Sequence, residues 1–320
     1  MRVMRALLLL LCSIFIFSCC SKDKEEIQVK IEKGESLTDI AKKLKDKDII
    51  DSATLFKLWA RITGNSDKLK AGRYSFRKHT GVRATLRTLV EGKSLSIAVT
   101  IPEGYTLREI AELFEHKAGI DKDEFLALAH DTSYIRRLGL KGNSLEGFLY
   151  PDTYFIYYGI ESSQVIEAMV RRFFTIFNDK FKQRSQDIGL SMEEVVTLAS
   201  IIEEEAQVDS EKFIISSVYH NRLRMGKLLE CDATIQYILP KRKARLLYND
   251  LKIDSPYNTY LYPGLPPGPI CSPGRTAIKA ALWPKKTDYL YFVARGDGTH
   301  IFSKTLKEHI TAKRKVRGNR

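Results

Sequence analysis

The chain has 320 residues, of which 44% are hydrophobic and 28% charged, and its formal net charge is +13. This balance excludes a disordered tail and leaves room for two globular domains. The positive charge suits an anionic partner, whether nucleic acid, a membrane surface or an anionic wall polymer. However, the Lys and Arg residues are spread along the chain, and only residues 313–320 form a dense basic run. We therefore expect a solvated basic surface and, because no nucleic-acid motif is present, no nucleic-acid partner.

The first 20 residues have the pattern of an export signal or a membrane anchor. Two arginines precede an uncharged apolar run from Ala6 to Cys20, and charged residues follow at once. The run is short for a membrane span, which takes about 20 residues. Residues 16–19 resemble a bacterial lipobox, with Cys19 or Cys20 as the lipidated residue, and a short uncleaved anchor is the alternative. Either form predicts a protein tethered to the cell membrane, with its charged part facing the periplasm.

Cys231 and Cys271 are the two cysteines that remain outside this leader. They could form a disulfide in an exported domain, but their spacing does not decide the matter. The six histidines are scattered, and no Cys/His cluster has the spacing of metal ligands. We therefore predict no metal.

A short pattern occurs twice, at an offset of 70 residues. The segment Ile31–Ala41, with Gly34 and a Leu-x-x-Ile-Ala run, recurs as Ile101–Ala111. Each copy predicts a strand, a glycine turn and a helix capped by Ser36 or Thr106. The copies resemble LysM, a module that binds the glycan of peptidoglycan and chitin. The alternative is a pair of βα units that pack on one shared small sheet.

The other elements follow from hydrophobic period and capping residues. A helix from 162 to 182 has a core face of Val165, Met169, Phe173 and Phe177. The remaining expectations are strands at 71–76 and 95–101, helices at 82–90, 191–207 and 209–226, a further helix that begins at Asp232, and a hairpin of 289–294 with 299–302.

The helix expected at 191–207 carries the clearest chemical signal. Ser191 and Glu194 form a capping box, and stepping about 100° per residue places Glu203 within an apolar arc. Glu204 points toward the polar face, and Glu205 lies at the edge of the arc. A lone carboxylic acid in apolar surroundings has a raised pKa and can act as a general acid. The alternative is a helix that ends in a solvated Glu run, with Glu203 reaching past the core or pairing with an Arg.

Several polar motifs surround this helix in the sequence. Residues 145–154 place Gly, Pro and aromatic residues around Glu146 and Asp152, which is more typical of a binding rim than of a core element. Asn221 and Arg222 fall in the last turn of the next helix, where they could face a sugar; Arg222 could instead interact with the helix dipole. Asp232 is either an N-cap or a catalytic group. Residues 255–274 hold six of the ten prolines and suit the wall of an extended groove.

Seven motifs follow one another along the chain: Leu145-Glu146-Gly147, Pro151-Asp152-Thr153-Tyr154, Ala199-Ser200-Ile201-Ile202-Glu203, Asn221-Arg222-Leu223, Asp232-x-Thr234-x-x-Tyr237, Tyr257-Asn258-Thr259-Tyr260 and the Pro-rich run from Gly264. Taken together, they resemble the motifs of the YceG-like family, the membrane-anchored endolytic murein transglycosylases once labelled aminodeoxychorismate lyase-like. The resemblance covers residues 28 to 312. Members of the family commonly have Lys after the catalytic Glu, where this chain has Glu204.

The resemblance implies an α+β fold with LysM-like βα repeat subdomains and an α+β catalytic domain that has a Pro/Gly-rich groove wall. The implied domains are a leader at 1–20, a repeat region at 27–144 with copies near 27–76 and 97–144, a catalytic domain at 145–312 and a basic tail at 313–320. It assigns catalysis to Glu203. The implied substrate-binding residues are Glu146, Asp152, Tyr154, Asn221, Arg222, Asp232, Thr234, Tyr237, Asn258 and Tyr260.

The implied activity is lytic transglycosylation within nascent peptidoglycan strands. Glu203 would act first as acid and then as base, so that the muramoyl 6-hydroxyl closes a 1,6-anhydro ring without a cofactor. Such an enzyme would terminate strand elongation, with penicillin-binding proteins as candidate partners. A wall-binding module with a structural Glu203 is one alternative. A pyridoxal-phosphate lyase is another, but it needs a Schiff-base Lys and cytoplasmic substrates.

Overall fold

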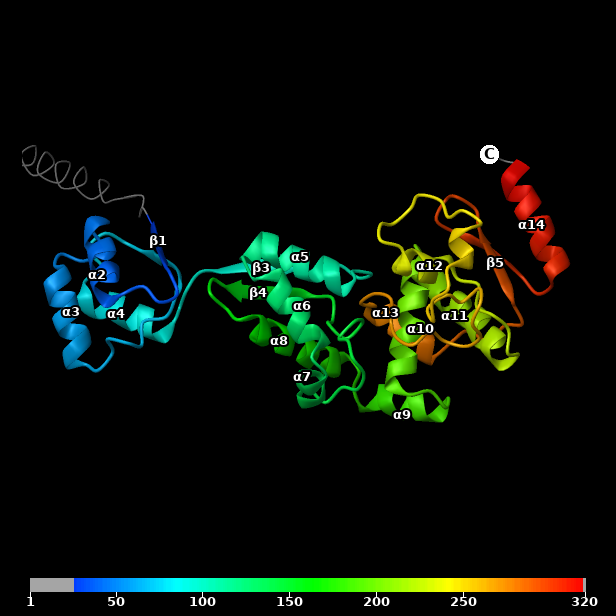
Figure 1. Ribbon diagram of the computed structural model, residues 1–320, viewed down its shortest axis with the longest axis horizontal. Coiled ribbons are helices and arrows are strands. Elements are labelled where there is room, and N and C mark those ends of the chain that lie inside the picture. The colour runs from blue at the N-terminus through cyan, green and yellow to red at the C-terminus, as the bar shows by residue number, and fades with distance from the viewer. Residues whose placement is uncertain (1–25, 319–320) are drawn as a thin grey trace, which may run out of the picture. The chain divides into compact units, whose positions relative to one another are not determined.

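The computed structural model describes residues 26–318, so the expected leader lies outside the described part of the chain. The fold mixes helices with small two-stranded sheets, and the expected α+β class is confirmed (Figure 1). Two compact units are present: the described residues up to Ser96 with Tyr157–Gly159, and Ile97–Ile156 with the chain from Ile160 onward. Within residues 26–318, no helix has both the length and the apolar character needed to cross a bilayer.

The first repeat copy forms the core of the first unit. Strand β1 pairs antiparallel with β2, and the two helices between them pack on each other. Ser36 caps the first helix, as predicted, by accepting a hydrogen bond from the backbone N–H of Asp39. The elements of this unit are β1 (Ile27–Ile31), α2 (Leu37–Asp46), α3 (Ala53–Ile62), β2 (Gly72–Phe76) and α4 (Val82–Glu91).

The second repeat copy has the same order of strand, helices and closing strand. Thr106 caps its first helix in a full capping box with Glu109, as predicted. The elements are β3 (Ser96–Thr100), α5 (Leu107–Ala118), α6 (Lys122–His130), α7 (Thr132–Arg137) and β4 (Thr153–Tyr157). Because β1 pairs with β2 and β3 pairs with β4, the alternative of one shared sheet is wrong.

The expected domain boundary at 144/145 does not coincide with a break in packing. Buried residues of the second copy, including Ile110 and Phe114, belong to one hydrophobic cluster with Ile202 and Leu282. Apolar surface is buried most effectively in one continuous core, and the second copy joins the core of the residues that follow it. The first copy has a separate cluster that includes Ile40, Leu44 and Phe56.

Helices make up most of the second unit after β4. The expected helix at 162–182 is two helices, because the chain turns at Phe177 and Asn178 caps a new helix. The predicted hairpin is confirmed as an antiparallel pair of β5 and β6. The elements are α8 (Ser162–Ile176), α9 (Asp179–Asp187), α10 (Met192–Glu205), α11 (Asp209–Arg224), α12 (Asp232–Ile238), η1 (Asp250–Lys252), α13 (Arg275–Leu282), β5 (Tyr291–Ala294), β6 (His300–Ser303) and α14 (Leu306–Gly318).

Helix α10 is central to the second unit and packs against α9, α11, α12 and α13. Its capping box of Ser191 and Glu194 is confirmed. The expectation of a polar face is wrong, because Thr197 and Ser200 are as deeply buried as their apolar neighbours. Their hydroxyls donate to backbone carbonyls within the helix, which satisfies them without water. Residues 195–202 of α10 are therefore surrounded by protein, and the Glu204 side chain, which is 12% exposed, lies against Arg242 rather than on a solvated face.

Candidate functional site

Glu203 lies in the last turn of α10, and its side chain is 9% exposed. Its Oε1 accepts a hydrogen bond from Lys212 Nζ at 2.7 Å, and its Oε2 accepts one from the backbone N–H of Gly274 at 2.9 Å. The expectation of a lone carboxyl in apolar surroundings is therefore wrong. The alternative expectation, an ion pair, agrees better with the structure, although the cation is a Lys from α11 rather than an Arg. Donors from two elements thus hold both oxygens of this carboxylate.

Lys212 is the centre of an acidic cluster. Its side chain is 4% exposed, and its Nζ lies 2.9 Å from Asp209 Oδ1 and 3.8 Å from Glu103 Oε2, in addition to the contact with Glu203. Burial by itself would lower the pKa of Lys212, but hydrogen bonds to Glu203 and Asp209 outweigh it and raise the pKa. Asp209 is the first residue of α11, one turn before Lys212, and its carboxylate is available for Lys212.

Glu103 brings a second carboxyl close to Glu203 from the turn between β3 and α5. A Cβ added to Gly274 would fall 1.9 Å from the carboxyl carbon of Glu103, so only glycine allows this approach. Burial, and then the negative charge of Glu203, raise the pKa of Glu103. The sequence analysis missed Glu103 and Lys212. The repeat pattern had marked residues 101–104 only as a turn, and Lys212 comes from a different helix.

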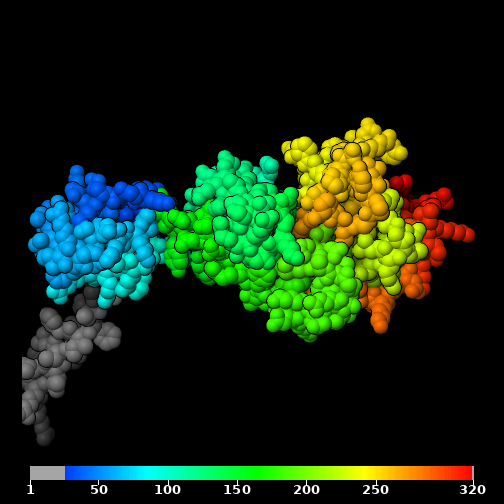
Figure 2. All heavy atoms as spheres, turned by 60° about the horizontal axis from the view of Figure 1, so that its bottom comes forward, coloured from blue at the N-terminus to red at the C-terminus, as the bar shows by residue number. Residues whose placement is uncertain are grey.

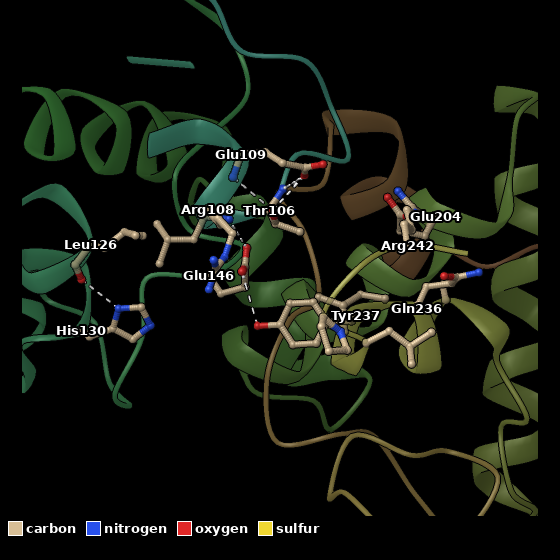
Figure 3. A pocket seen from close by; sticks show the side chains of 15 residues that line it. Thr106, Arg108, Glu109, Leu126, His130, Glu146, Glu204, Gln236, Tyr237 and Arg242 are labelled. Atoms are coloured by element: carbon tan, nitrogen blue, oxygen red, sulfur yellow. Dashed lines mark hydrogen bonds and ion pairs between the residues drawn. The ribbon is translucent and has the colours of Figure 1, made fainter. Parts of the chain in front are cut away.

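A pocket of about 460 Å³ lies beside the next carboxylate, Glu204 (Figure 3). Its lining includes Arg108 from the start of α5, Glu146 from the segment before β4, Tyr237 from α12 and Arg242 from the loop after α12. Glu204 pairs with Arg242, and a Cβ on Gly104 would lie 3.2 Å from Glu204 Oε1. Burial raises the pKa of Glu204, and the charge of Arg242 opposes this shift. The pocket therefore places charged groups of both signs beside apolar side chains such as Leu126 and Leu239.

Glu146 is the most deeply buried carboxyl of this pocket. Its Oε1 accepts from the backbone N–H of Leu107 at 2.9 Å, and its Oε2 accepts from the Tyr237 hydroxyl at 3.4 Å. Figure 3 shows the Tyr237 hydroxyl pointing at this carboxyl. Burial raises the pKa of Glu146 to about 7. The structure thus brings Glu146 and Tyr237 together, two residues that lie far apart in the sequence.

Residues 145–151 are buried, so the expected binding rim is a core segment. Gly147 has a positive φ of 80° and packs against Pro269, where a Cβ would clash. Asp152 and Tyr154 line a different hollow, next to α8. Asp152 accepts from Arg172 Nε at 2.6 Å, and Tyr154 donates to the carbonyl of Tyr150 at 2.6 Å. These two residues are not brought to the Glu204 pocket.

Asn221 and Arg222 are buried at the end of α11. Asn221 donates from Nδ2 to the carbonyls of Thr287 and Tyr289, at 2.8 and 2.9 Å. Arg222 pairs with Glu230, and its guanidinium lies 5.3 Å from the ring centroid of Tyr291. Both side chains join α11 to the segment that leads into β5 and to the strand itself.

The last group of predicted site residues joins α12 to the Pro-rich segment. Thr234 bonds to Thr259, and Asn258 holds its loop by donating to the carbonyls of Leu251 and Ile253. Tyr260 donates to Asp232 Oδ1 at 2.5 Å, so Asp232 accepts from a tyrosine and does not cap its helix. The segment from 240 to 270, yellow to gold in Figure 2, forms part of the surface of the second unit.

The cysteines outside the leader, Cys231 and Cys271, are both free and buried. The Cys231 thiol donates to Glu205 Oε1 at 3.0 Å, and burial raises the pKa of both groups. Within residues 26–318, no group of three or more His, Cys, Asp or Glu side chains could hold a metal ion.

The fold and this site define an α+β protein in which a repeat turn, a central helix and a Pro-rich segment converge on a paired glutamate. The model of the YceG-like family matches residues 29–315 of the chain. The chain therefore belongs to the YceG-like family.

Two relatives and one solved structure support this assignment. The chain is 35% identical, over 308 residues, to a Bacillus subtilis protein named endolytic murein transglycosylase, covering 91% of this chain and 85% of the relative. It is 29% identical to a Streptococcus pneumoniae protein of the same name, covering 90% of this chain but 58% of that longer protein. A crystal structure of a YceG-like protein from Listeria monocytogenes aligns with a TM-score of 0.64 and 35% identity, over 90% of this chain and 99% of that one.

Proposed function

We propose that the chain is a peptidoglycan lytic transglycosylase in which Glu203 is the catalytic residue. Its relatives bear the name endolytic murein transglycosylase. The observation that carries the assignment of Glu203 is the fixed orientation of its carboxylate, held by Lys212 Nζ at 2.7 Å and by Gly274 N at 2.9 Å. Held in this way, the carboxylate has little rotational freedom to lose when it meets a substrate.

One carboxyl group is enough for this reaction. Protonated Glu203 gives its proton to the oxygen that links N-acetylmuramic acid to N-acetylglucosamine, and positive charge develops at the muramoyl C1. The resulting carboxylate then takes the proton of the muramoyl 6-hydroxyl, which attacks C1 and closes a 1,6-anhydro ring. The nucleophile belongs to the substrate and has a high effective molarity, so neither a second carboxylate nor a cofactor is needed.

We also propose that the pocket beside Glu204 binds a sugar unit of the glycan strand. Binding sites combine apolar surface with a few well-placed polar groups, and this pocket presents Tyr237 and Leu107 together with Glu146 and Arg242. We assign Glu146 and Tyr237 to this subsite. For Asn221, Thr234 and Asn258, the buried contacts with neighbouring backbone and side chains support a role in holding the surrounding loops.

The first experiment is Glu203→Gln, which keeps the shape of the side chain and removes the titrating proton. We expect the rate of strand cleavage to fall by about 10²-fold or more, the range typical of a general acid, while glycan binding persists. Glu204→Gln is the matched control. Because Glu204 lines the pocket, we expect it to change KM more than kcat. A Glu203→Gln variant that keeps more than about a tenth of the wild-type rate contradicts the assignment.

The second experiment identifies the products of cleavage in H₂¹⁸O. An internal nucleophile predicts 1,6-anhydromuramoyl ends without ¹⁸O, and cleavage inside strands as well as at their tips. The competing function is hydrolysis, which needs a second carboxylate. Glu103 is the candidate for that group, since it lies 3.8 Å from the ammonium that pairs with Glu203. Reducing muramic ends that carry ¹⁸O would establish hydrolysis.

We further propose that the enzyme is tethered to the cell membrane by its N-terminus and terminates glycan strands beside peptidoglycan synthases. The support is the leader pattern of residues 1–20 and the net charge of +13, which suits anionic surfaces. A reporter fused to residues 1–30 should fractionate with membranes and face the periplasm. If the Cys19→Ala, Cys20→Ala pair leaves the tether intact, the anchor is an uncleaved segment rather than a lipid.

A further inference from the structure

Three carboxylates from three different elements face the ammonium of Lys212. Glu203 comes from α10, Asp209 from the first turn of α11, and Glu103 from the turn before α5, with distances to Nζ of 2.7, 2.9 and 3.8 Å. The Lys212 side chain is 4% exposed, so the ammonium depends on these carboxylates rather than on water. Breaking a buried pair of this kind is costly, because the remaining charge stays uncompensated.

We propose that Lys212 is a positioning residue for Glu203 and that Glu103 competes with Glu203 for its ammonium. This proposal rests on the proposed function of Glu203. Lys212 orients the carboxylate through Oε1, while Gly274 fixes Oε2. The same ammonium compensates the negative charge of the ionised Glu203 carboxylate, which it contacts at 2.7 Å.

The Lys212 ammonium can interact either with Glu203 or with Asp209 and Glu103. When Glu203 is ionised, Lys212 bonds to it at 2.7 Å. When Glu203 carries the proton that it donates to the leaving oxygen, its attraction for the ammonium falls. Lys212 then interacts more strongly with Asp209, already within 2.9 Å, and with Glu103, within 3.8 Å. The cluster thereby accommodates both protonation states of Glu203 without exposing a buried charge.

Other titratable groups face this site, and the pH behaviour depends on all of them. Glu204 adjoins Glu203 on α10, and the Cys271 thiol lies in the segment before α13, where burial raises its pKa. Both are negatively charged when ionised, so neither replaces the positive charge of Lys212. The groups to consider together are Glu103, Glu204, Asp209, Lys212 and Cys271.

The test compares the pH dependence of kcat/KM for Lys212→Met and Glu103→Gln with that of the wild-type chain. Lys212→Met removes the cation, which favours the protonated form of a nearby carboxyl, so the alkaline limb should move up by about one pH unit or more. The rate at the optimum should fall on the order of a hundredfold, because the carboxylate loses its orientation. Glu103→Gln removes a negative charge and should move the same limb in the opposite direction.

Lys212→Arg keeps the charge and should hold the alkaline limb near its wild-type position, even if its size slows the reaction. If Lys212→Met leaves the limb in place, or if Lys212→Met and Glu103→Gln shift it in the same direction, the proposal is overturned. Should Lys212→Met fail to fold, the other two variants test the proposal. It then requires that Glu103→Gln moves the alkaline limb down and that Lys212→Arg leaves the limb near its wild-type position. Failure of the proposed function is recognised separately, because the wild-type chain would then yield no anhydromuramoyl ends.

Discussion

The two repeat copies share a sequence pattern and an order of elements, yet they are packed differently. In the first copy, Ile40 of α2 packs in a cluster formed only by described residues of the first unit. In the second copy, Ile110 stands at the same position of α5 and packs in the cluster that contains Ile202 of α10. One copy therefore closes its own core, and the other supplies part of the core behind the candidate catalytic helix.

The glycine turns show the same contrast. Gly34 and Gly104 both have a φ of 82°, so both turns need the left-handed φ that favours glycine. A Cβ on Gly34 would meet nothing within 4 Å, whereas one on Gly104 would lie 3.2 Å from Glu204 Oε1. Next to this glycine, the first copy has Lys33 where the second has Glu103. A glycine turn of this kind thus lies next to the candidate site, beside Glu204, in only one of the two copies.

The largest expected effect comes from the matched pair Ile110→Ala and Ile40→Ala. Each removes a fully buried side chain, and each should lower the free energy of unfolding of its own unit by about 2–5 kcal/mol. Because Ile110 shares a core with α10, Ile110→Ala should also reduce strand cleavage, while Ile40→Ala should leave it close to wild type. Thermal unfolding and a cleavage assay measure the two effects. Equal losses of cleavage would mean that the first copy also supports the site.

The second prediction concerns Glu146, which accepts from the first turn of α5 and so contacts the second copy of the repeat rather than the first. Burial raises its pKa from 4.5 to about 7. Between these values the native state keeps a proton that the unfolded chain has released, so stability falls as the pH rises. The loss across this window should be about 3 kcal/mol.

Glu146→Gln tests this pH dependence. Glutamine is neutral throughout the window, and its carbonyl can still accept from Leu107. Between pH 4.5 and 7, the stability of the variant should therefore fall much less than that of the wild-type chain. Glu112→Gln, at a half-exposed position on α5, serves as the control. Urea unfolding at a series of pH values gives the slopes. Parallel slopes for wild type and Glu146→Gln would show that this carboxyl is ionised in the folded protein.

The smallest expected effect is that of Gly104→Ala against Gly34→Ala. An L-residue at this positive φ costs about 1 kcal/mol, and both variants should lose that amount of stability. Gly104→Ala should in addition press on Glu204 and raise KM several-fold, whereas Gly34→Ala should leave KM unchanged. Steady-state kinetics on purified glycan strands separates the two. Equal KM values for Gly104→Ala and Gly34→Ala would show that Glu204 does not contribute to substrate binding.

Local patterns in the sequence predicted the local structure well. The capping residues Ser36, Thr106 and Ser191 begin helices as expected, because capping depends on residues within one turn. The hairpin around 296–298 and the buried face of α8 also follow from short-range patterns. Motif order alone pointed to the YceG-like family. Glu203 as the catalytic residue stays a prediction.

Contacts between distant segments could not be predicted in this way. Helical period placed Glu204 on a polar face. However, α9, α11, α12 and α13 pack around α10, so residues 195–202 of this helix have no solvent-exposed face. The partners of Glu203 lie on other elements, Lys212 on α11 and Gly274 before α13. No period within a single helix encodes a contact of that kind.

The sequence by itself determined the repeat, the starts of several helices and the family, since each depends on neighbouring residues or on motif order. Only the tertiary structure decided which copy of the repeat joins the site. Gly104 and Gly34 have the same φ, but a Cβ would contact Glu204 at one position and nothing at the other. The surroundings of a carboxyl group, and with them its partners and its charge state, arise from chain segments that meet only in the folded protein.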